Sequence, residues 1–290
     1  MKNKPDFTDT IEEWSNFFIP LHDGVQLAAR AWLPINAIEQ PVPAILEYIP
    51  YRKRDGTAIR DEQMHPYWAA FGYACVRVDI RGSGESDGLL LDEYLQQELE
   101  DAVEVIGWLE QQDWCSGKVG MMGKSWGGFN SLQVAALRPV ALKAIITVCS
   151  TDDRYADDCH YRGGALLVEN FSWASTISCY MAKSPDPLLL PDTWREHWLE
   201  RLQNMPLFAR NWLEHTYKDA YWKHGSINED YSAIEAAVYC VGGWGDAYSV
   251  AIPRIIQGLS GPKKALIGPW AHKYPNFASP KPEMDFLAEA

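Results

Sequence analysis

The run Met121-Met122-Gly123-Lys124-Ser125-Trp126-Gly127-Gly128 decides the fold of this chain. The residues before it, 117–122, predict a short buried strand, and residues 129–137 predict a helix. A G-x-S-x-G sequence between a strand and a helix is typical of a serine on a sharp turn, where larger neighbours would clash. Such a turn exposes the Ser125 hydroxyl at the carboxyl edge of a sheet and at a helix N-terminus, which favours negative charge. The pattern predicts a nucleophilic serine; a plain glycine-rich turn is the alternative.

Short apolar strands alternate with helical segments on both sides of this run. Apolar residues three or four positions apart predict an amphipathic helix over residues 93–111. The turn signal Asp23-Gly24 predicts a hairpin within residues 17–34. Further strands are predicted at residues 43–49, 73–80, 142–148, 236–241 and 264–267. The alternation predicts an α/β fold with a mainly parallel sheet covered by helices on both faces.

The alternation breaks at about residue 152 and resumes near residue 236. The segment between these points is polar, aromatic and helical in character, and Trp173 is one of its tryptophans. We therefore predict a core made of residues 1–151 and 236–290, interrupted by a helical cap insertion at residues 152–235.

Composition excludes several classes of function. Of the 290 residues, 47% are hydrophobic, which predicts a packed globular core. The net charge of −13 disfavours nucleic acid and anionic membranes as partners, since both are bound mainly through Lys and Arg. The start, Met1-Lys2-Asn3-Lys4-Pro5-Asp6, is not followed by an apolar run of signal-peptide length, so we expect no export signal. No stretch has the length and apolar character of a membrane span. The six cysteines form no C-x-x-C pair or zinc spacing, so we expect free thiols and a cytoplasmic location: Cys75, Cys115, Cys149, Cys159, Cys179 and Cys240.

A nucleophilic serine needs a base, and the base needs an orienting acid. In α/β-hydrolases these follow in the order Ser, Asp or Glu, His, each after a strand. Asp246 follows the strand at 236–241, and His272 follows the strand at 264–267. We predict the triad Ser125, Asp246 and His272, with no metal or organic cofactor. The alternatives are a helix cap for Asp246 and an ordinary loop residue for His272.

At this point the chain resembles the CocE/NonD hydrolases, the group of cocaine esterase and the α-amino acid ester hydrolases, allied to the X-Pro dipeptidyl-peptidases of family S15. The resemblance extends from about residue 17 to about residue 286. It rests on five features: residues 48–53 (YIPYRK), residues 79–88 (DIRGSGESDG), residues 123–128 (GKSWGG), Asp246, and residues 268–272 (GPWAH). It implies an α/β-hydrolase fold and an oxyanion hole formed by the Tyr51 hydroxyl and the backbone N–H of Trp126. Tyr48 is the alternative tyrosine, and packing in a loop is the alternative role for Tyr51.

Two departures from the family pattern bear on function. Family members usually continue into a jelly-roll domain, whereas this sequence stops at Ala290, in a segment predicted to be helical. We therefore expect the catalytic part alone, with a surface left bare. Amino acid ester hydrolases hold an ammonium group with a carboxylate cluster; Asp158 matches one member, but Tyr248 and Ser249 are neutral where the other acids are expected. Asp158 could equally be a solvated surface residue.

The glycine-rich segment 81–88 follows a predicted strand, so nucleotide binding is one interpretation. It lacks the G-x-G-x-x-G spacing and a matching acidic ribose ligand. A tight structural turn beside the site is the better interpretation.

The sequence as a whole predicts an acyl esterase of the CocE/NonD type that takes a small ester or amide, or a short peptide. Asp158, Trp173 and Tyr248 are the candidate substrate-binding residues. An X-Pro dipeptidyl-peptidase is the rival enzyme, anchored by Asp157, Asp158 or Glu169. The alternative outside the enzymes is a non-catalytic binding module with the same fold. The sequence leaves a homo-oligomer open.

Overall fold

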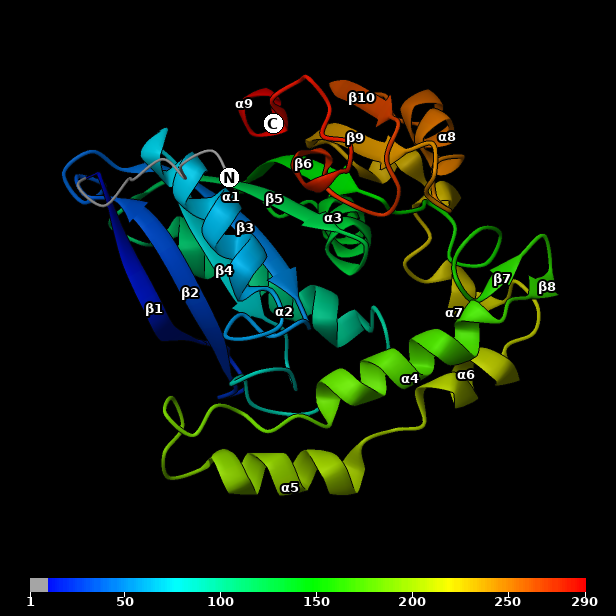
Figure 1. Ribbon diagram of the computed structural model, residues 1–290, viewed down its shortest axis with the longest axis horizontal. Coiled ribbons are helices and arrows are strands. Elements are labelled where there is room, and N and C mark those ends of the chain that lie inside the picture. The colour runs from blue at the N-terminus through cyan, green and yellow to red at the C-terminus, as the bar shows by residue number, and fades with distance from the viewer. Residues whose placement is uncertain (1–9) are drawn as a thin grey trace.

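The computed structural model of the protein describes residues 10–290, and an eight-stranded sheet forms its centre (Figure 1). The strand order is β1-β2-β4-β3-β5-β6-β9-β10. The first two strands form an antiparallel hairpin, β2 pairs antiparallel with β4, and the remaining pairs are all parallel. The bounds are β1 (Ile11–Pro20), β2 (Gln26–Pro34), β3 (Val42–Ile49), β4 (Ala74–Asp79), β5 (Cys115–Lys124), β6 (Leu142–Val148), β9 (Ala237–Gly243) and β10 (Lys263–Gly268).

Residues that alternate along each strand divide between two hydrophobic clusters, one on each face of the sheet. Met121 lies in the cluster that includes α2 (Gln96–Glu110), α3 (Trp126–Ala136) and α8 (Ala251–Gly258). Met122 lies in the cluster that includes α1 (Ala58–Ala70) and α9 (Phe286–Glu289). Because successive strand side chains point to opposite faces, both faces need a helical cover. The α/β fold predicted from the alternation, with a mainly parallel sheet covered by helices on both faces, is confirmed.

The predicted hairpin turn also forms. Leu21 N–H donates to Val25 O at 2.8 Å, and Gly24 has φ +90°, a left-handed conformation that glycine adopts without strain. The helix predicted at 93–111 begins later, at Gln96, because residues 92–94 form a buried bend in which Tyr94 also has a positive φ.

The chain between β6 and β9 leaves the sheet and lies beside it (Figure 1). Its start and end meet at a neck, where Asn228 N–H donates to Asp152 O at 3.1 Å. The segment contains a short hairpin that the sequence did not predict, in addition to helices. Its elements are β7 (Tyr161–Arg162), β8 (Ala165–Leu166), α4 (Glu169–Met181), α5 (Trp194–Asn204), α6 (Phe208–Glu214), α7 (Ala220–Lys223), η1 (Ile227–Glu229) and η2 (Tyr231–Ala233). The cap bounds 152–235 and the two core segments stay a prediction.

Polar contacts hold this insertion against the core. Arg201 of α5 is buried and donates to the backbone oxygens of Gly84 and Ser86. Arg52 donates to Ser184 O at 2.8 Å. The loop after β4 and the loop after β3 therefore both support the insertion.

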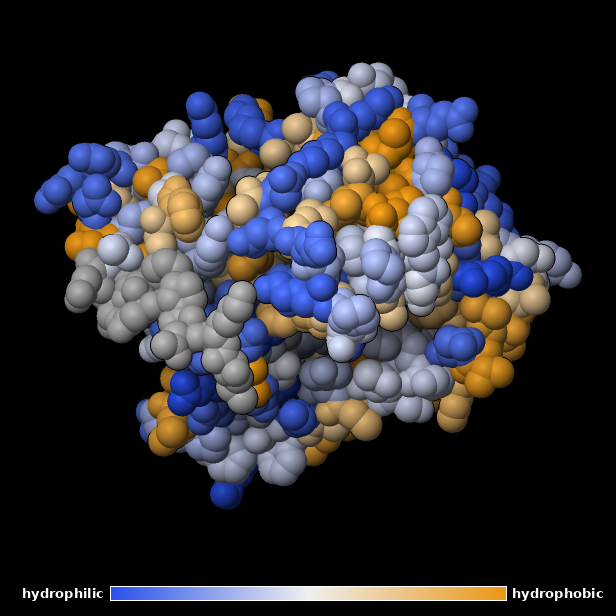
Figure 2. Space-filling view, turned by 45° about the horizontal axis from the view of Figure 1, so that its top comes forward, coloured by the Kyte–Doolittle hydropathy of each residue, from blue (hydrophilic) through white to orange (hydrophobic). Residues whose placement is uncertain are grey.

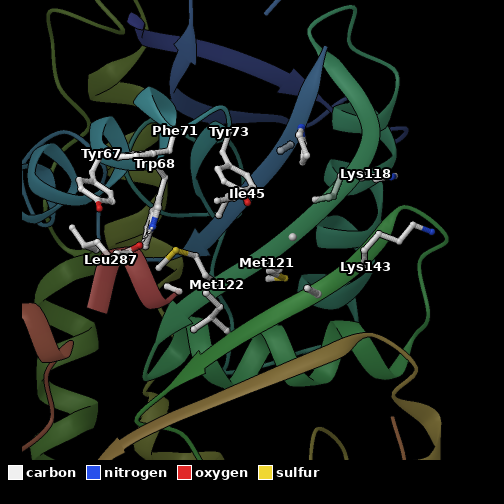
Figure 3. A pocket seen from close by; sticks show the side chains of 18 residues that line it. Ile45, Tyr67, Trp68, Phe71, Tyr73, Lys118, Met121, Met122, Lys143 and Leu287 are labelled. Carbon is white, nitrogen blue, oxygen red and sulfur yellow. Dashed lines mark hydrogen bonds between the residues drawn. The ribbon is translucent and has the colours of Figure 1, made fainter. Parts of the chain in front are cut away.

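A cavity of about 610 Å³ lies on the α1 face of the sheet (Figure 3), and Ser125 is not among the residues that line it. Tyr67 and Trp68 of α1, with Phe71 just after that helix, face Met122 of β5 across it, and Leu287 of α9 closes one side. Trp68 Nε1 donates to Leu287 O at 2.9 Å, which fixes the position of α9.

Blue polar and orange apolar side chains are interspersed over the face shown in Figure 2. No helix within residues 10–290 has the length and apolar character needed to cross a bilayer. All six cysteines are free thiols, and four of them are buried: Cys75, Cys115, Cys149 and Cys240. The amino-terminal residues 1–6, on which the expected lack of an export signal rests, lie outside the described residues.

Candidate active site

Ser125 joins β5 to α3 in a strained turn. Its backbone has φ +59° and ψ −120°, a conformation that residues other than glycine rarely adopt. The flanking glycines are required by close packing, since a Cβ on Gly123 would lie 2.4 Å from Gly127 Cα. A Cβ on Gly127 would in turn lie 2.7 Å from Ile49 Cγ2. The sharp strand-to-helix turn predicted from the pentapeptide is the turn that forms.

Asp246 and His272 lie at the carboxyl ends of two paired parallel strands, β9 and β10. His272 Nδ1 lies 2.9 Å from Asp246 Oδ1. The Asp246 side chain is 2% exposed, whereas the His272 side chain is 39% exposed. A Cβ on Gly243 would lie 1.8 Å from Trp270 O, so this glycine lets the two loops approach each other closely. The structure therefore brings together two residues that are 26 positions apart.

The loop that carries His272 adjoins the Ser125 turn. Lys124 Nζ donates to His272 O at 3.3 Å, and Ser125 N–H donates to Val148 O at 2.8 Å. Cys149, which follows Val148, has its Sγ 3.8 Å from Lys273 O. Within residues 10–290 no hydrogen bond joins Ser125 to His272. Catalytic hydrogen bonds are often long in the absence of substrate and shorten when it binds.

Tyr51 and Trp126 lie together on the side of the insertion. The Tyr51 ring centroid is 6.5 Å from that of Trp126, 6.4 Å from that of Trp173 and 5.3 Å from that of Tyr180. Burial raises the pKa of the Tyr51 phenol well above its usual value, so the hydroxyl keeps its proton and can donate it in a hydrogen bond. Trp126 is the first residue of α3, where a backbone N–H has no partner within the helix. Tyr48, the alternative, lies fully buried in the core.

The three candidate substrate-binding residues surround this region. Tyr248 donates its hydroxyl to Asp158 Oδ1 at 2.9 Å, and its ring centroid is 5.7 Å from that of His272. The ring centroid of Trp173, in α4, lies 6.2 Å from that of Trp126. Asp158 is 3% exposed, and burial raises the pKa of its carboxyl. Asp158 is therefore not the solvated surface residue that the sequence left as an alternative.

Sequence reasoning missed a buried acid–histidine pair next to these residues. His160 Nε2 lies 2.8 Å from Glu93 Oε2, and the indole N–H of Trp173 donates to Glu93 Oε1. Burial opposes ionisation of Glu93, but the neighbouring His160 and Arg154 outweigh it and lower the pKa of Glu93. The two residues are 67 positions apart, and no local periodicity links them. The only signal in the sequence was the position of Glu93 at the start of the helix predicted over residues 93–111.

Three groups of side chains within the described residues have potential metal-ligand atoms less than 4.8 Å apart. The first is Cys149, Asp246 and His272, and the second is Asp158, Cys159 and His160. In the third, Glu47, Asp61 and His65, arginines already pair with the carboxylates, since Arg60 Nη2 lies 2.6 Å from both Glu47 and Asp61.

Comparisons with known proteins agree with this architecture. The sequence matches the X-Pro dipeptidyl-peptidase (S15) family over residues 23–274. It is 28% identical over 284 residues to cocaine esterase from Rhodococcus sp. (strain MB1 Bresler), which covers 89% of this chain and 48% of the relative. It is 28% identical over 196 residues to a putative Xaa-Pro dipeptidyl-peptidase from Streptomyces avermitilis, which covers 62% of this chain and 26% of the relative. The chain thus spans about half the length, or less, of these curated relatives.

Solved structures show the same fold at low sequence identity. A CocE/NonD family hydrolase from Staphylococcus aureus superimposes with a TM-score of 0.67 and 20% identity, covering 89% of this chain and 46% of that one. An α-amino acid ester hydrolase superimposes with a TM-score of 0.64 and 22% identity, covering 96% and 52%. The family match extends over most of the chain and agrees with the motifs and the fold. The chain belongs to the X-Pro dipeptidyl-peptidase (S15) family of α/β-hydrolases.

Proposed function

We propose that this chain is a serine hydrolase that cleaves a carboxylic ester or amide through an acyl-enzyme. Ser125 is the nucleophile, His272 the general base and Asp246 the acid that orients the histidine. The observation that carries the proposal is the 2.9 Å contact between His272 Nδ1 and Asp246 Oδ1. A carboxylate that accepts the Nδ1 proton leaves Nε2 unprotonated and able to act as a base.

The reaction proceeds in two halves. Ser125 Oγ attacks the carbonyl carbon while His272 Nε2 takes the hydroxyl proton. The tetrahedral intermediate collapses, the imidazolium gives this proton to the leaving alcohol or amine, and the acyl group stays on Ser125. His272 then takes a proton from water, whose oxygen attacks the acyl carbon, and returns the proton to Ser125 Oγ as the acid leaves. Asp246 stays ionised and stabilises the imidazolium in both halves.

The Tyr51 hydroxyl and the Trp126 N–H donate to the oxyanion of each tetrahedral intermediate. Two features support these roles: the Tyr51 ring packs against Trp126, and its phenol keeps its proton because it is buried. Removing one such donor from a hydrolase typically costs about 2.7–4 kcal/mol of transition-state stabilisation.

Aromatic side chains support a small, largely apolar acyl or leaving group as the substrate class. Trp173 and Tyr180 from the insertion face Tyr51, and Tyr248 lies beside His272. Pockets of this kind bind through apolar surface and take their orientation from a few polar groups.

An exopeptidase that recognises a peptide amino group is the second candidate, and one residue favours it. Asp158 is a buried carboxylate that accepts a hydrogen bond from Tyr248, whose ring centroid lies 5.7 Å from that of His272. The other two proposed anchors fit less well. Asp157 Oδ2 is already paired with Arg254 at 2.7 Å, and Glu169 stands at the start of α4 on the exposed side.

Labelling with a fluorophosphonate tests the nucleophile. We expect the wild-type chain to form a covalent adduct that is missing in Ser125→Ala; undiminished labelling of the variant would disprove the assignment. Hydrolysis of p-nitrophenyl esters compared with X-Pro anilides separates the two enzyme candidates. A chain that neither labels nor hydrolyses any member of this panel would support the non-catalytic binding module.

A further inference from the structure

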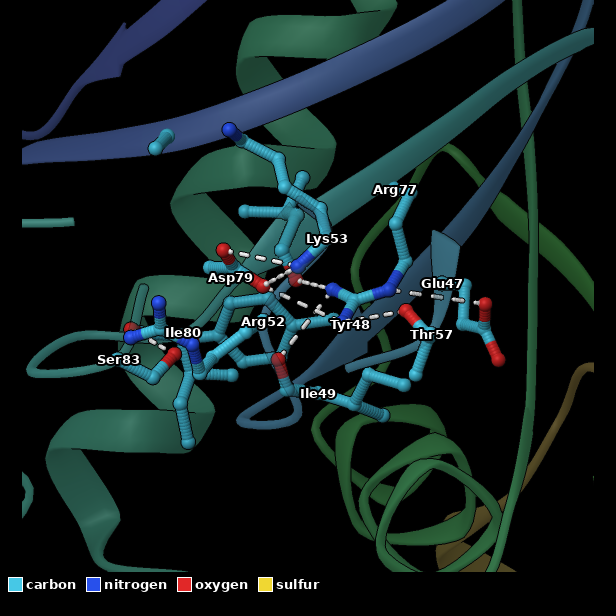
Figure 4. A network of polar contacts seen from close by, with 12 residues as sticks. Glu47, Tyr48, Ile49, Arg52, Lys53, Thr57, Arg77, Asp79, Ile80 and Ser83 are labelled. Atoms are coloured by element: carbon cyan, nitrogen blue, oxygen red, sulfur yellow. Dashed lines mark hydrogen bonds and ion pairs between the residues drawn. The ribbon is translucent and has the colours of Figure 1, made fainter. Parts of the chain in front are cut away.

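The carboxylate of Asp79, at the end of β4, holds the loop after β3 at Lys53 (Figure 4). The same loop carries Tyr51. The Lys53 backbone N–H donates to both carboxylate oxygens of Asp79, at 2.8 Å to Oδ1 and 3.1 Å to Oδ2. Arg77 Nη2 lies 3.2 Å from Oδ1, and both side chains of this ion pair are 0% exposed. A charge buried this deeply persists only when it is paired and hydrogen-bonded, so the arrangement has little freedom to move.

The same ion pair fixes the backbone on both sides of Tyr51. Arg77 Nη1 donates to Ile49 O at 3.3 Å, two residues before Tyr51, and Asp79 binds Lys53 N–H two residues after it. Between these anchors Arg52 has φ +62°, a conformation that an unrestrained loop would leave. A Cβ on Gly56 would lie 1.9 Å from Tyr51 O, so the loop also closes tightly on itself.

The glycine-rich segment that follows β4 is shaped around Asp79. A Cβ on Gly84 would lie 2.0 Å from Asp79 Oδ2, so only glycine fits there. Ser86 Oγ donates to Asp79 O at 2.6 Å and accepts a hydrogen bond from Ala28 N–H at 2.8 Å. Lys53 Nζ meets Glu85 of the same segment at 2.9 Å. Residues 81–88 therefore form a loop that packs closely around the Asp79 carboxylate.

We propose that Asp79 is a positioning residue for the oxyanion hole: by binding the Lys53 N–H and Arg77, it sets the position of the Tyr51 hydroxyl. The inference rests on the proposed function, in which Tyr51 stabilises the oxyanion. A hydroxyl that is displaced by about 1 Å loses most of its transition-state interaction, and such displacements can cost roughly 10²-fold in rate. Substrate binding, which does not use the oxyanion, is left intact.

The test is a double-mutant cycle on hydrolysis of p-nitrophenyl butyrate. The variants are Asp79→Asn, Tyr51→Phe and the two combined. Asp101→Asn is the matched control, because Asp101 is also a buried carboxylate paired with an arginine, Arg81 at 2.7 Å. Within residues 10–290 the Asp101 side chain makes no hydrogen bond or ion pair with the loop that carries Tyr51. The concentration of active sites is measured by labelling Ser125 to completion with a fluorophosphonate, and kcat is calculated from that concentration. Unfolded protein in any variant is then left out of kcat.

We expect Asp79→Asn to lower kcat roughly 10- to 100-fold with little change in KM, and Tyr51→Phe to lower it about 10²- to 10³-fold. In the Tyr51→Phe background, Asp79→Asn should change kcat by less than about twofold, because it acts through a hydroxyl that is no longer there. Asp101→Asn should keep the wild-type kcat.

Three results would overturn the inference. The first is a wild-type kcat in Asp79→Asn, and the second is a double variant whose fold-loss in kcat equals the product of the two single losses. The third is a loss of kcat in Asp101→Asn as large as that in Asp79→Asn. A wild-type kcat in Tyr51→Phe would instead refute the oxyanion role of Tyr51 within the proposed function. The two failures are therefore distinguishable.

Discussion

His272 Nδ1 and Asp246 Oδ1 lie 2.9 Å apart, and the second oxygen of Asp246, Oδ2, is buried without a hydrogen-bond partner among residues 10–290. Asp246 therefore contacts His272 through Oδ1 alone. An amide in its place would present either a second donor or a rotated oxygen to the imidazole. We expect Asp246→Asn to lower kcat by roughly 10³- to 10⁴-fold, because the histidine would adopt the wrong tautomer. Steady-state kinetics with urea unfolding as a check on the fold would measure this, and a loss below about tenfold would contradict it.

Glu98 links α2 to the Ser125 turn and makes stability depend on pH. It accepts a hydrogen bond from Trp126 Nε1 at 2.6 Å, and burial raises the pKa of its carboxyl to about 7. Because the pKa is higher in the folded than in the unfolded state, the contribution of Glu98 to stability is greatest below about pH 4.5 and falls as the pH rises towards 7. The fall attributable to Glu98 is roughly 3 kcal/mol.

Glu98→Gln should remove this part of the pH dependence. Urea unfolding of both proteins at pH 5 and pH 8 would show the variant gaining stability relative to the wild type as the pH rises. Parallel pH profiles for the two proteins would refute the prediction.

Two glycines provide a matched pair for the packing of the nucleophile turn. Gly123→Ala would place a Cβ 2.4 Å from Gly127 Cα, and backbone cannot give way there, so we expect a loss of roughly 3 kcal/mol or more in the free energy of unfolding. A Cβ on Gly107, within α2, would meet no neighbouring atom within 4 Å. Gly107→Ala should raise stability by about 0.5–1 kcal/mol. Urea denaturation measures both, and similar values for the two variants would show that the turn tolerates a side chain.

Trp173 should limit the length of the acyl group. Its indole lies beside Tyr51 and Trp126, so Trp173→Ala opens space next to the two proposed oxyanion donors. We expect kcat/KM for p-nitrophenyl hexanoate to rise roughly tenfold relative to the acetate ester. Trp173→Phe removes the N–H that binds Glu93 but keeps an aromatic ring, and it should leave the chain-length preference near that of the wild type. A shift of equal size in both variants would assign the effect to Glu93 instead of to volume.

The sequence predicted the parts of the site that follow local rules. Ser125 was recognisable because glycines on both sides of a serine, between a strand and a helix, satisfy a steric requirement within a few residues. Asp246 and His272 could be placed because each follows an apolar strand, and the carboxyl ends of parallel strands share one edge of a sheet. The contact between them confirms that they lie together; their catalytic roles remain proposals.

Contacts between distant segments could not be predicted in this way. Glu93 and His160 meet because the insertion folds back onto the bend before α2, and nothing in either segment encodes that meeting. The β7–β8 hairpin has two-residue strands, too short for an alternating pattern to be visible. The role of Asp79 depends on a backbone N–H of another loop, which carries no signal in the side-chain sequence.

The neck between Asp152 and Asn228 has a practical consequence for redesign. Because the two backbones are joined by a hydrogen bond there, residues 153–227 leave and re-enter the core at one point. The whole insertion can therefore be exchanged: an insertion from a related chain, spliced at these two junctions, would bring new side chains next to Tyr51 while the Ser125 turn and the Asp246–His272 pair stay unchanged. The return path from Asn228 through η2 to β9 would remain untouched.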